Sequence, residues 1–446
     1  MKRPVDQARR VAFDALRAVH ADSAYANLVL SKLLSERHLS SRDAAFATEL
    51  TSGTCRMEGT YDLIIAAAAG RKLSSLQPAV LDVLRLGAHQ LLAMRVPTHA
   101  AVAATVNLAS ATVGERVTGL TNAVLRRVAA RTYDEWVEAL TVGLDQLSTL
   151  AVQTAHPRWV VDAYADVLPP AEVGAALQAN NASPAISLAV RPGLADVDEL
   201  VAAGAKPAQH SPFATTWAGN PADLPAVRSG RAGVQDEGSQ LVAWGLARGA
   251  AAPGWWLDLC AGPGGKSALL AGLAPHDGSR LLSNEVSQHR AELVVGAVSG
   301  YAGQQNPPAM LIADGTRPGW RPAQFTRVLV DAPCSGLGAL RRRPESRWRR
   351  STADVEQMHP LQCALLETAL DSAAPGGLVA YATCSPHVRE TTDVVAEVLA
   401  GRDDVEAEDA RTLLPELADA WLGPYLQLWP HRHGTDAMFA AYLRRT

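Results

Sequence analysis

The sequence lacks several features that mark secreted, zinc-binding and membrane proteins. Its 446 residues include only five cysteines, and no two of them form a C-x-x-C pair. Neither a zinc site nor a disulfide framework is therefore predicted, and unpaired thiols fit a reducing compartment. No apolar run approaches the ~20 residues that a membrane-spanning helix needs. Because Met1–Asp6 lead into a polar helix rather than a secretory signal, we expect a cytoplasmic protein with no membrane partner.

The sequence also lacks a large excess of positive or negative charge. The net charge is −4 and only 19% of the residues are charged, whereas 48% are hydrophobic. This composition excludes a disordered chain and predicts two or three globular domains. It also excludes a uniformly basic surface, so any contact with nucleic acid has to come from local clusters of basic residues.

Residues 257–267 (LDLCAGPGGKS) carry the most specific local pattern. A short apolar strand, a glycine-rich turn and the start of a helix follow one another, as in the first unit of a nucleotide-binding α/β sheet. The dinucleotide-binding pattern G-x-G-x-x-G fails at Ser267, and the phosphate-binding loop requires glycine where Cys260 stands. S-adenosylmethionine remains as a ligand without phosphate, and a merely structural turn is the alternative.

Strands and helices alternate after this loop, which predicts a mostly parallel, doubly wound α/β sheet. Residues near the end of the chain are expected to add an antiparallel hairpin. Around His431 and His433 a hairpin turn is favoured over a metal site, and no metal is expected. The expected strands are 255–259, 280–285, 309–313, 327–331 and 377–383, the expected helices 266–273, 287–298, 354–371 and 388–399, and the hairpin 425–430 with 437–443.

Polar residues end several of these strands, where a parallel sheet binds its ligand. Glu285 suits the two hydroxyls of a ribose, although a helix cap is the alternative. Asp314 suits the amino group of an adenine, although a plain turn also fits it. Asp331, Cys334 and Cys384 follow two further strands. Both thiols are therefore expected at one pocket.

Three motifs together resemble a known family: residues 260–266 (CAGPGGK), 331–336 (DAPCSG) and 383–385 (TCS). In this order they are similar to the signature set of the RNA (cytosine-5) methyltransferases. Within that superfamily the chain resembles, over nearly its whole length, the bacterial Sun-type (RsmB-like) enzymes that methylate 16S ribosomal RNA. The resemblance implies S-adenosylmethionine as the cofactor, bound by Cys260, Ala261, Gly262, Pro263, Gly264, Gly265, Lys266, Glu285, Asp314 and Asp331.

Methylation at carbon 5 of cytosine requires a thiolate that adds to carbon 6 and makes carbon 5 nucleophilic. The sequence cannot rank the two cysteines; the resemblance implies that Cys384 attacks and that Cys334 assists release of the product. Asp331 suits the carboxyl group that holds ring nitrogen 3. Lys266 is a candidate for lowering the pKa of the attacking thiol.

Two positions depart from the family's pattern. Alanine is frequent where Gly262 stands, a change that the turn tolerates. An acid followed by asparagine is common after the T-C-S motif, whereas Glu390 is followed by Thr391 here. The resemblance therefore does not fix the pocket wall near the nucleophile.

Residues 341–350 (RRRPESRWRR) form the one dense basic tract, with six arginines around a tryptophan. Such a tract suits contacts with phosphates and stacking on an unpaired base. The target cytosine has to be unpaired, because a paired base cannot reach the thiol. A solvated loop is the alternative. The tentative RNA-binding residues are Arg341, Arg342, Arg343, Arg347 and Trp348.

Three parts are predicted along the chain. Residues 1–140 show helical periodicity without strand patterns and resemble the all-α NusB-like RNA-binding domain of the Sun-type enzymes. Residues 141–230 are expected to form linker helices and a small α+β arm, which the resemblance implies binds RNA. Residues 231–446 are expected to form the Rossmann-like methyltransferase domain.

The sequence thus predicts a multidomain, S-adenosylmethionine-dependent RNA (cytosine-5) methyltransferase. We expect a monomer whose partner is 16S ribosomal RNA or a small-subunit precursor. The same chemistry on transfer RNA is the first alternative. A non-catalytic NusB-like RNA-binding factor is the second, disfavoured by the intact cysteines and cofactor loop. A phosphate-loop NTPase is the third, disfavoured by Cys260.

Overall fold

The computed structural model describes residues 5–446, so Met1–Pro4, on which part of the prediction about a secretory signal rests, lie outside the described residues. The chain divides into two compact units. The first contains the residues up to Ala182 together with Leu340–Arg350, and the second contains Ser183–Ala339 and Ser351–Thr446. Among the described residues, no helix combines the length and the apolarity that a membrane crossing requires.

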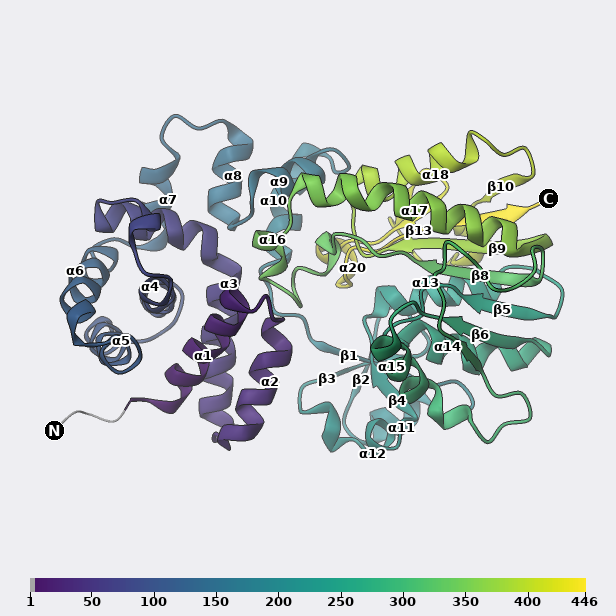
Figure 1. The fold of residues 1–446 in the computed structure, drawn as a ribbon, viewed down its shortest axis with the longest axis horizontal. Helices are drawn as coiled ribbons and strands as arrows, with labels where there is room; N and C mark the ends of the chain where they lie inside the picture. Colours follow the sequence, from purple (N-terminus) through teal and green to yellow (C-terminus); the bar gives the residue numbers. More distant parts are fainter. Residues whose placement is uncertain (1–4) are drawn as a thin grey trace. The chain divides into compact units, whose positions relative to one another are not determined.

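The first unit is helical, as predicted for the N-terminal part of the chain, and in Figure 1 its helices appear in purple to blue apart from α16 (Ser346–Arg349), which is green. Apolar residues at helical spacing, such as Val11 and Ala15 in the first helix, are fully buried. The helices are α1 (Gln7–Ala21), α2 (Ala26–Arg37), α3 (Ser41–Ala69), α4 (Pro78–Leu92), α5 (Thr98–Thr112), α6 (Thr118–Val128), α7 (Tyr133–Thr141), α8 (Gln146–Thr154), α9 (Arg158–Ala165), α10 (Pro170–Ala179) and, from the later segment, α16 (Ser346–Arg349).

A cluster of charged side chains, partly to fully buried, lies where α1, α3 and α4 meet. His20 Nδ1 lies 2.7 Å from Asp82 Oδ1, and its Nε2 lies 3.1 Å from Glu58 Oε2. Arg85 pairs with Glu58 and Asp62 at 2.9 and 2.6 Å. Burial lowers the pKa of His20, but the hydrogen bonds and charges of Asp82 and Glu58 outweigh it and raise the pKa to about 9. The cluster therefore holds His20 as a cation at neutral pH.

The basic tract of residues 341–350 folds into this helical unit. Arg347 has no exposed surface, and its guanidinium donates to two backbone carbonyls and, at 2.7 Å, to Oδ1 of Asn181. The indole N–H of Trp348 donates to the carbonyl of Cys55 at 2.8 Å. In this structure protein oxygens therefore occupy the two terminal nitrogens of Arg347, and its predicted RNA contact stays a prediction. Contacts by the other residues of that set stay predictions.

The second unit begins with the arm, which has the predicted α+β class. Its antiparallel sheet has the strand order β2-β3-β1-β4. The predicted three-part division, with boundaries at residues 140 and 230, differs from the two units because α8, α9 and α10 lie in the first. The arm contains β1 (Ile186–Val190), α11 (Val197–Ala202), β2 (Lys206–Pro207), β3 (Ala214–Trp217), α12 (Pro225–Arg228) and β4 (Ala232–Val234).

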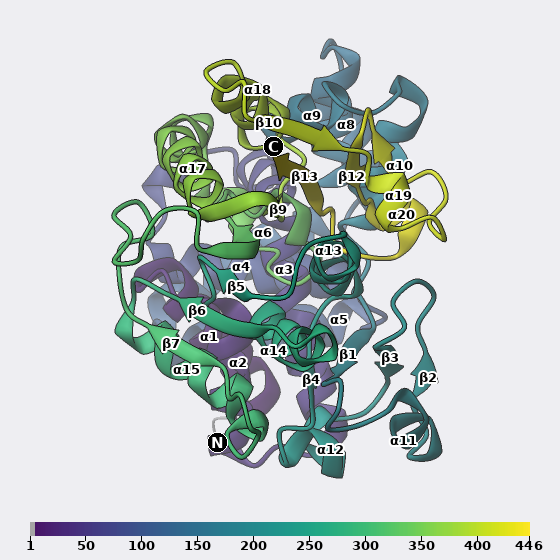
Figure 2. The same ribbon diagram turned by 90° about the vertical axis from the view of Figure 1, so that its right-hand side faces the viewer.

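A sheet of nine strands, counted within residues 5–446, forms the rest of the second unit. Its order is β11-β12-β13-β9-β8-β5-β6-β7, with β10 beside β13; Figure 2 shows these strands side by side from β12 down to β7. The strands are β5 (Trp255–Asp258), β6 (Arg280–Asn284), β7 (Ala309–Leu311), β8 (Phe325–Asp331), β9 (Ala373–Thr383), β10 (Val405–Glu408), β11 (Trp421–Leu422), β12 (Tyr425–Gln427) and β13 (Phe439–Arg445).

The pairing confirms the predicted doubly wound sheet. Strands β7, β6, β5, β8 and β9 are parallel, and β13 joins β9 and β12 antiparallel, as expected of the terminal hairpin. Successive residues of β8 point to opposite faces: Leu329 packs in one apolar core and Val328 and Val330 in another. Helices α13 (Glu237–Arg248) and α14 (Gly265–Leu273) cover the first core, and α17 (Thr352–Ser372) and α18 (Thr392–Leu399) cover the second.

Candidate active site

The candidate site lies at the carboxyl ends of β5 and β8. From β5 the chain proceeds to β6 and β7 on one side, and then returns to β8 and β9 on the other. An open parallel sheet binds its ligand at such a switch point. The loop of residues 259–264 follows β5 and the loop of residues 332–336 follows β8, so the topology brings the glycine motif and the first cysteine motif to one edge.

Glu285 ties the glycine loop to the end of β6. Its buried carboxylate accepts the backbone N–H of Gly262 at 2.9 Å and that of Ser287 at 3.0 Å. Arg290, on α15 (Gln288–Val298), donates to the carbonyl of Gly262 and lies 3.6 Å from Glu285. A Cβ on Gly262 would come within 2.4 Å of Glu285 Oε2, so the family's alanine would require another placement of this carboxylate. The ribose contact stays a prediction.

Gly264 and Lys266 form the start of α14. Gly264 has a φ of +108°, and a Cβ there would lie 2.6 Å from Ala297, so the turn requires glycine. Lys266 Nζ lies 2.7 Å from Asp331 Oδ2. Burial lowers the pKa of Lys266, but the charge of Asp331 and its hydrogen bond, with a contribution from Cys384, outweigh burial and raise the pKa. Lys266 therefore stays positively charged beside the strand ends.

Cys334 and Cys384 meet at the carboxyl ends of the adjacent strands β8 and β9. Their Sγ atoms are 3.4 Å apart, and both side chains are half-buried. The hydrogen bond to Cys384, followed by burial, raises the pKa of Cys334 well above its ordinary value. Cys334 therefore keeps its proton at neutral pH.

Glu390, in the short helix η7 (Val388–Glu390), joins the two cysteine loops. Its fully buried carboxylate accepts the N–H of Ser335 at 2.7 Å, the Ser335 hydroxyl, and the amide of Gln362 at 3.4 Å. Ser335 Oγ in turn lies 3.2 Å from Ser385 Oγ. One carboxylate thus fixes the residues that follow both cysteines. Thr391, the departure from the family's pattern, is buried and donates to a backbone carbonyl of the preceding turn.

Asp258 is a site residue that the sequence interpretation missed. It ends β5 without exposed surface, and its Oδ2 accepts the Ser267 hydroxyl at 2.6 Å. Burial, together with the charge of Asp331, raises the pKa of Asp258 to about 7. Within residues 5–446 its Oδ1 has no hydrogen-bond partner. A buried carboxylate oxygen beside a glycine turn fits a ligand with a positive charge and N–H donors, as S-adenosylmethionine has.

Asp314 and Cys260, two of the predicted cofactor-binding residues, have local structural contacts in the loops after β7 and β5. Asp314 is exposed beyond β7, and its Oδ1 accepts the N–H and the hydroxyl of Thr316 at 2.9 and 2.8 Å. The Thr316 N–H lowers the pKa of Asp314. This is the geometry of a turn aspartate, and a contact with adenine stays a prediction. Burial raises the pKa of Cys260, which makes this thiol a protonated part of the loop wall.

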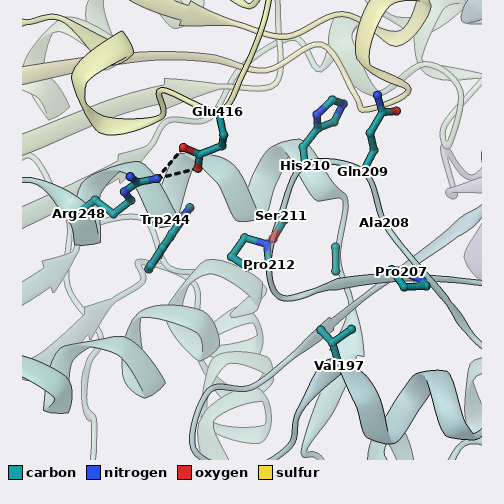
Figure 3. Close-up of a pocket in the computed structure, with 11 residues that line it drawn as sticks. Val197, Pro207, Ala208, Gln209, His210, Ser211, Pro212, Trp244, Arg248 and Glu416 are labelled. Atoms are coloured by element: carbon teal, nitrogen blue, oxygen red, sulfur yellow. Dashed lines mark hydrogen bonds and ion pairs between the residues drawn. The ribbon is translucent and has the colours of Figure 1, made fainter.

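A separate cavity of about 630 Å³ lies between the arm and α13. Figure 3 shows Arg248 paired with Glu416 beside Trp244, and His210 on the opposing loop. Its lining residues come from the arm, from α13 and from Glu416, and none belongs to the glycine loop or to the cysteine loops. This cavity is therefore distinct from the candidate active site.

Comparisons with known proteins identify two regions of the chain. Residues 250–444 match the family described as 16S rRNA methyltransferase RsmB/F, and residues 6–130 match the NusB family. The putative methyltransferase Rv1407 of Mycobacterium tuberculosis is 50% identical to this chain, over 100% of this chain and 98% of the relative's own length. The ribosomal RNA small subunit methyltransferase B of Pseudomonas putida is 33% identical over 88% of each chain.

Solved structures show the same fold. The crystal structure of PH0851 covers 100% of both chains with a TM-score of 0.81 at 20% identity. NSun6 from Pyrococcus horikoshii with SFG covers 65% of this chain and 98% of its own with a TM-score of 0.54 at 16% identity. The fold and the family are those of S-adenosylmethionine-dependent methyltransferases, as predicted. By its identity to full-length relatives and its two matching regions, the chain belongs to the RsmB/F family of methyltransferases, with an N-terminal NusB domain.

Proposed function

We propose that the chain methylates carbon 5 of a cytosine in small-subunit ribosomal RNA through a covalent adduct between Cys384 and carbon 6. One observation carries the proposal: the Sγ atoms of Cys334 and Cys384 lie 3.4 Å apart at the ends of adjacent parallel strands. The strand that leads to Cys334 ends in Asp331, which pairs with Lys266. A nucleophilic thiol, a second thiol that keeps its proton and a carboxylate are the groups that this reaction needs.

S-adenosylmethionine supplies an electrophilic methyl group when it is bound. The glycine loop of residues 260–266, with Glu285, Asp314 and Asp331, would hold it. The free oxygen of the buried Asp258 favours the same ligand, since a positive group would pair a carboxylate that is otherwise costly to bury.

The residues of the chain then act on the cytosine ring. The Cys384 thiolate adds to carbon 6, and the electron pair of the carbon 5–carbon 6 double bond moves to carbon 5, which is methylated. Asp331, positioned by Lys266, holds the ring edge at nitrogen 3, which takes up a proton on attack and gives it back when the adduct breaks down. Loss of the carbon 5 proton to a base restores the double bond, and the sulfur–carbon 6 bond breaks with its electrons returning to Cys384. Cys334 assists that release from its place beside the nucleophile.

Trapping the adduct tests these roles. With substrate RNA and S-adenosylmethionine, Cys334→Ala is expected to accumulate an RNA–protein complex that survives denaturing electrophoresis, because attack proceeds and release is slowed. Cys384→Ala and the double variant should form none, and Cys55→Ala serves as the control at a buried thiol of the helical unit. A complex formed by Cys384→Ala, or its absence from all variants, would contradict the assignment.

The substrate class rests on the relatives and the domain order. The Pseudomonas putida relative is named as a ribosomal RNA small subunit methyltransferase, and it aligns with 88% of this chain. The NusB region precedes the catalytic region as one continuous match over residues 6–130. We therefore assign RNA binding to both parts of the chain and small-subunit ribosomal RNA as the target.

A further inference from the structure

Two helices of the second unit bring together three metal-binding side chains that the proposed reaction does not use. His359 and Cys363 lie one turn apart on α17, and Glu397 comes from α18; Figures 1 and 2 both place these helices side by side. Their ligand atoms, an imidazole nitrogen, a thiol sulfur and a carboxylate oxygen, all lie within 4.8 Å of one another. His359 and Cys363 are buried and Glu397 is exposed.

The hydrogen bonds of His359 direct one ring nitrogen toward this cluster. Nδ1 lies 2.6 Å from the carbonyl oxygen of Arg389 and, because a carbonyl only accepts, Nδ1 carries a proton. In the neutral ring Nε2 then holds a lone pair, and it faces Glu397 Oε2 at 2.9 Å and Cys363 Sγ at 3.6 Å. A nitrogen lone pair and a carboxylate repel each other unless a cation lies between them. That cation is either a proton or a metal ion. In proteins, a histidine that binds a metal through one ring nitrogen usually donates a hydrogen bond from the other, often to a backbone carbonyl, as His359 does here.

The separations suit zinc. In a tetrahedral site with Zn–N of ~2.05 Å and Zn–S of ~2.3 Å, the nitrogen and sulfur atoms lie about 3.5 Å apart. The observed distance between His359 Nε2 and Cys363 Sγ is 3.6 Å. The same geometry separates the nitrogen from a carboxylate oxygen by about 3.4 Å. Glu397 would therefore have to move away from Nε2 by roughly 0.5 Å and come to about 3.6 Å from Cys363 Sγ, which lies within 4.8 Å of it, and an exposed side chain can make this change.

We propose that His359, Cys363 and Glu397 bind a divalent transition-metal ion, with Zn²⁺ as the best match to one nitrogen, one sulfur and one oxygen donor. Water completes the coordination on the exposed side. The thiol loses its proton as the metal–sulfur bond forms, and the ion also displaces the proton shared by His359 Nε2 and Glu397. The sequence pattern alone does not bring these three side chains together, because Glu397 joins the other two only when α18 packs on α17.

The surroundings indicate a structural rather than a catalytic ion. Gln362, next to Cys363, donates to the carbonyl of Pro333 at 2.8 Å. Arg389, whose carbonyl orients His359, directly precedes Glu390. An ion here would fix α17 against η7, the two elements that hold the loop after β8.

Titration of the metal-free, full-length chain with Co²⁺ tests the proposal. We expect one Co²⁺ per chain, a thiolate-to-cobalt charge-transfer band and the visible bands of tetrahedral cobalt, all removed by added Zn²⁺. Cys363→Ser should abolish the charge-transfer band. Glu397→Gln, at an exposed position where folding is not at risk, should weaken binding at least ~10-fold. Glu406→Gln, an exposed carboxylate on β10, is the matched control and should bind like the parent chain.

The closely spaced Cys334 and Cys384 are the rival thiol site, and Cys384→Ser separates the two. Retention of the cobalt spectrum in Cys384→Ser supports the site on α17 and α18. Loss of the spectrum in that variant, an unchanged affinity in Glu397→Gln, or no binding at equimolar metal would overturn the proposal.

Discussion

Replacing Glu390 with glutamine tests whether one buried carboxylate holds the catalytic loops in place. The carboxylate accepts two hydrogen bonds from Ser335 and one from Gln362. Glutamine offers a single oxygen, and its NH₂ group has to face one of these donors. The Ser335 hydroxyl then faces the NH₂ group, loses its charged acceptor and has to turn toward Ser385 Oγ; losing a hydrogen bond to a charged group costs ~1–3 kcal/mol. If about 2 kcal/mol of this cost is relieved by displacing the loop after β8, kcat/KM falls roughly 30-fold.

Single-turnover methyl transfer to substrate RNA, with the adduct measured in parallel, is the assay. Glu390→Gln should slow adduct formation and methylation together while leaving the affinity for S-adenosylmethionine unchanged, because the glycine loop is tied to Glu285 instead. Glu356→Gln, an exposed carboxylate on α17 that pairs with Arg389, is the matched control. A rate within about twofold of the parent chain in Glu390→Gln, or an equal loss in Glu356→Gln, would refute the reasoning.

Two further perturbations address charge. Lys266→Met removes the cation beside Asp331 and Cys384. Because a nearby cation favours a thiolate, the acidic limb of the pH–rate profile should move to higher pH in this variant. An unchanged profile would exclude Lys266 as the group that activates the thiol. In the helical unit, the pKa of His20 is raised on folding from 6.5 to about 9, which corresponds to about 3 kcal/mol. That contribution is fully present below about pH 6.5 and is lost as the pH rises through about 9. Urea titrations should therefore show His20→Gln less stable than the parent chain at pH 6, with the difference shrinking by pH 9.5; a difference constant with pH would contradict this account.

The parts of the fold that depend on local pattern were predictable from the sequence. The strand–glycine–helix unit at residues 255–273 was found because three local signals coincide: an apolar run, a glycine turn and helical periodicity. The terminal hairpin followed from two apolar stretches around a polar turn. Placing Cys334 and Cys384 together required only the rule that parallel strands end at the same edge.

What the sequence could not predict depends on tertiary partners. The arginine tract looks the same in sequence whether its guanidinium groups meet phosphates or, as for Arg347, carbonyl oxygens of the same unit. Asp258 looks like any acid at a strand end until burial leaves one of its oxygens without a partner among the residues that the structure describes. In the sequence, Glu390 stands out only because Thr391 rather than asparagine follows it, and nothing there indicates its structural role. Its contacts with Ser335 arise from the packing of two loops that are far apart in sequence.

The central claim, methylation of one cytosine in small-subunit ribosomal RNA by way of Cys384, is tested most directly by bisulfite sequencing. Ribosomal and transfer RNA would be compared from cells that carry the parent chain, cells that lack it, and cells in which Cys384→Ala is the only copy. The account predicts that one cytosine in 16S ribosomal RNA is protected with the parent chain and loses protection in the other two. Loss at a transfer RNA position instead would contradict the substrate, and no change at any cytosine would contradict the reaction itself.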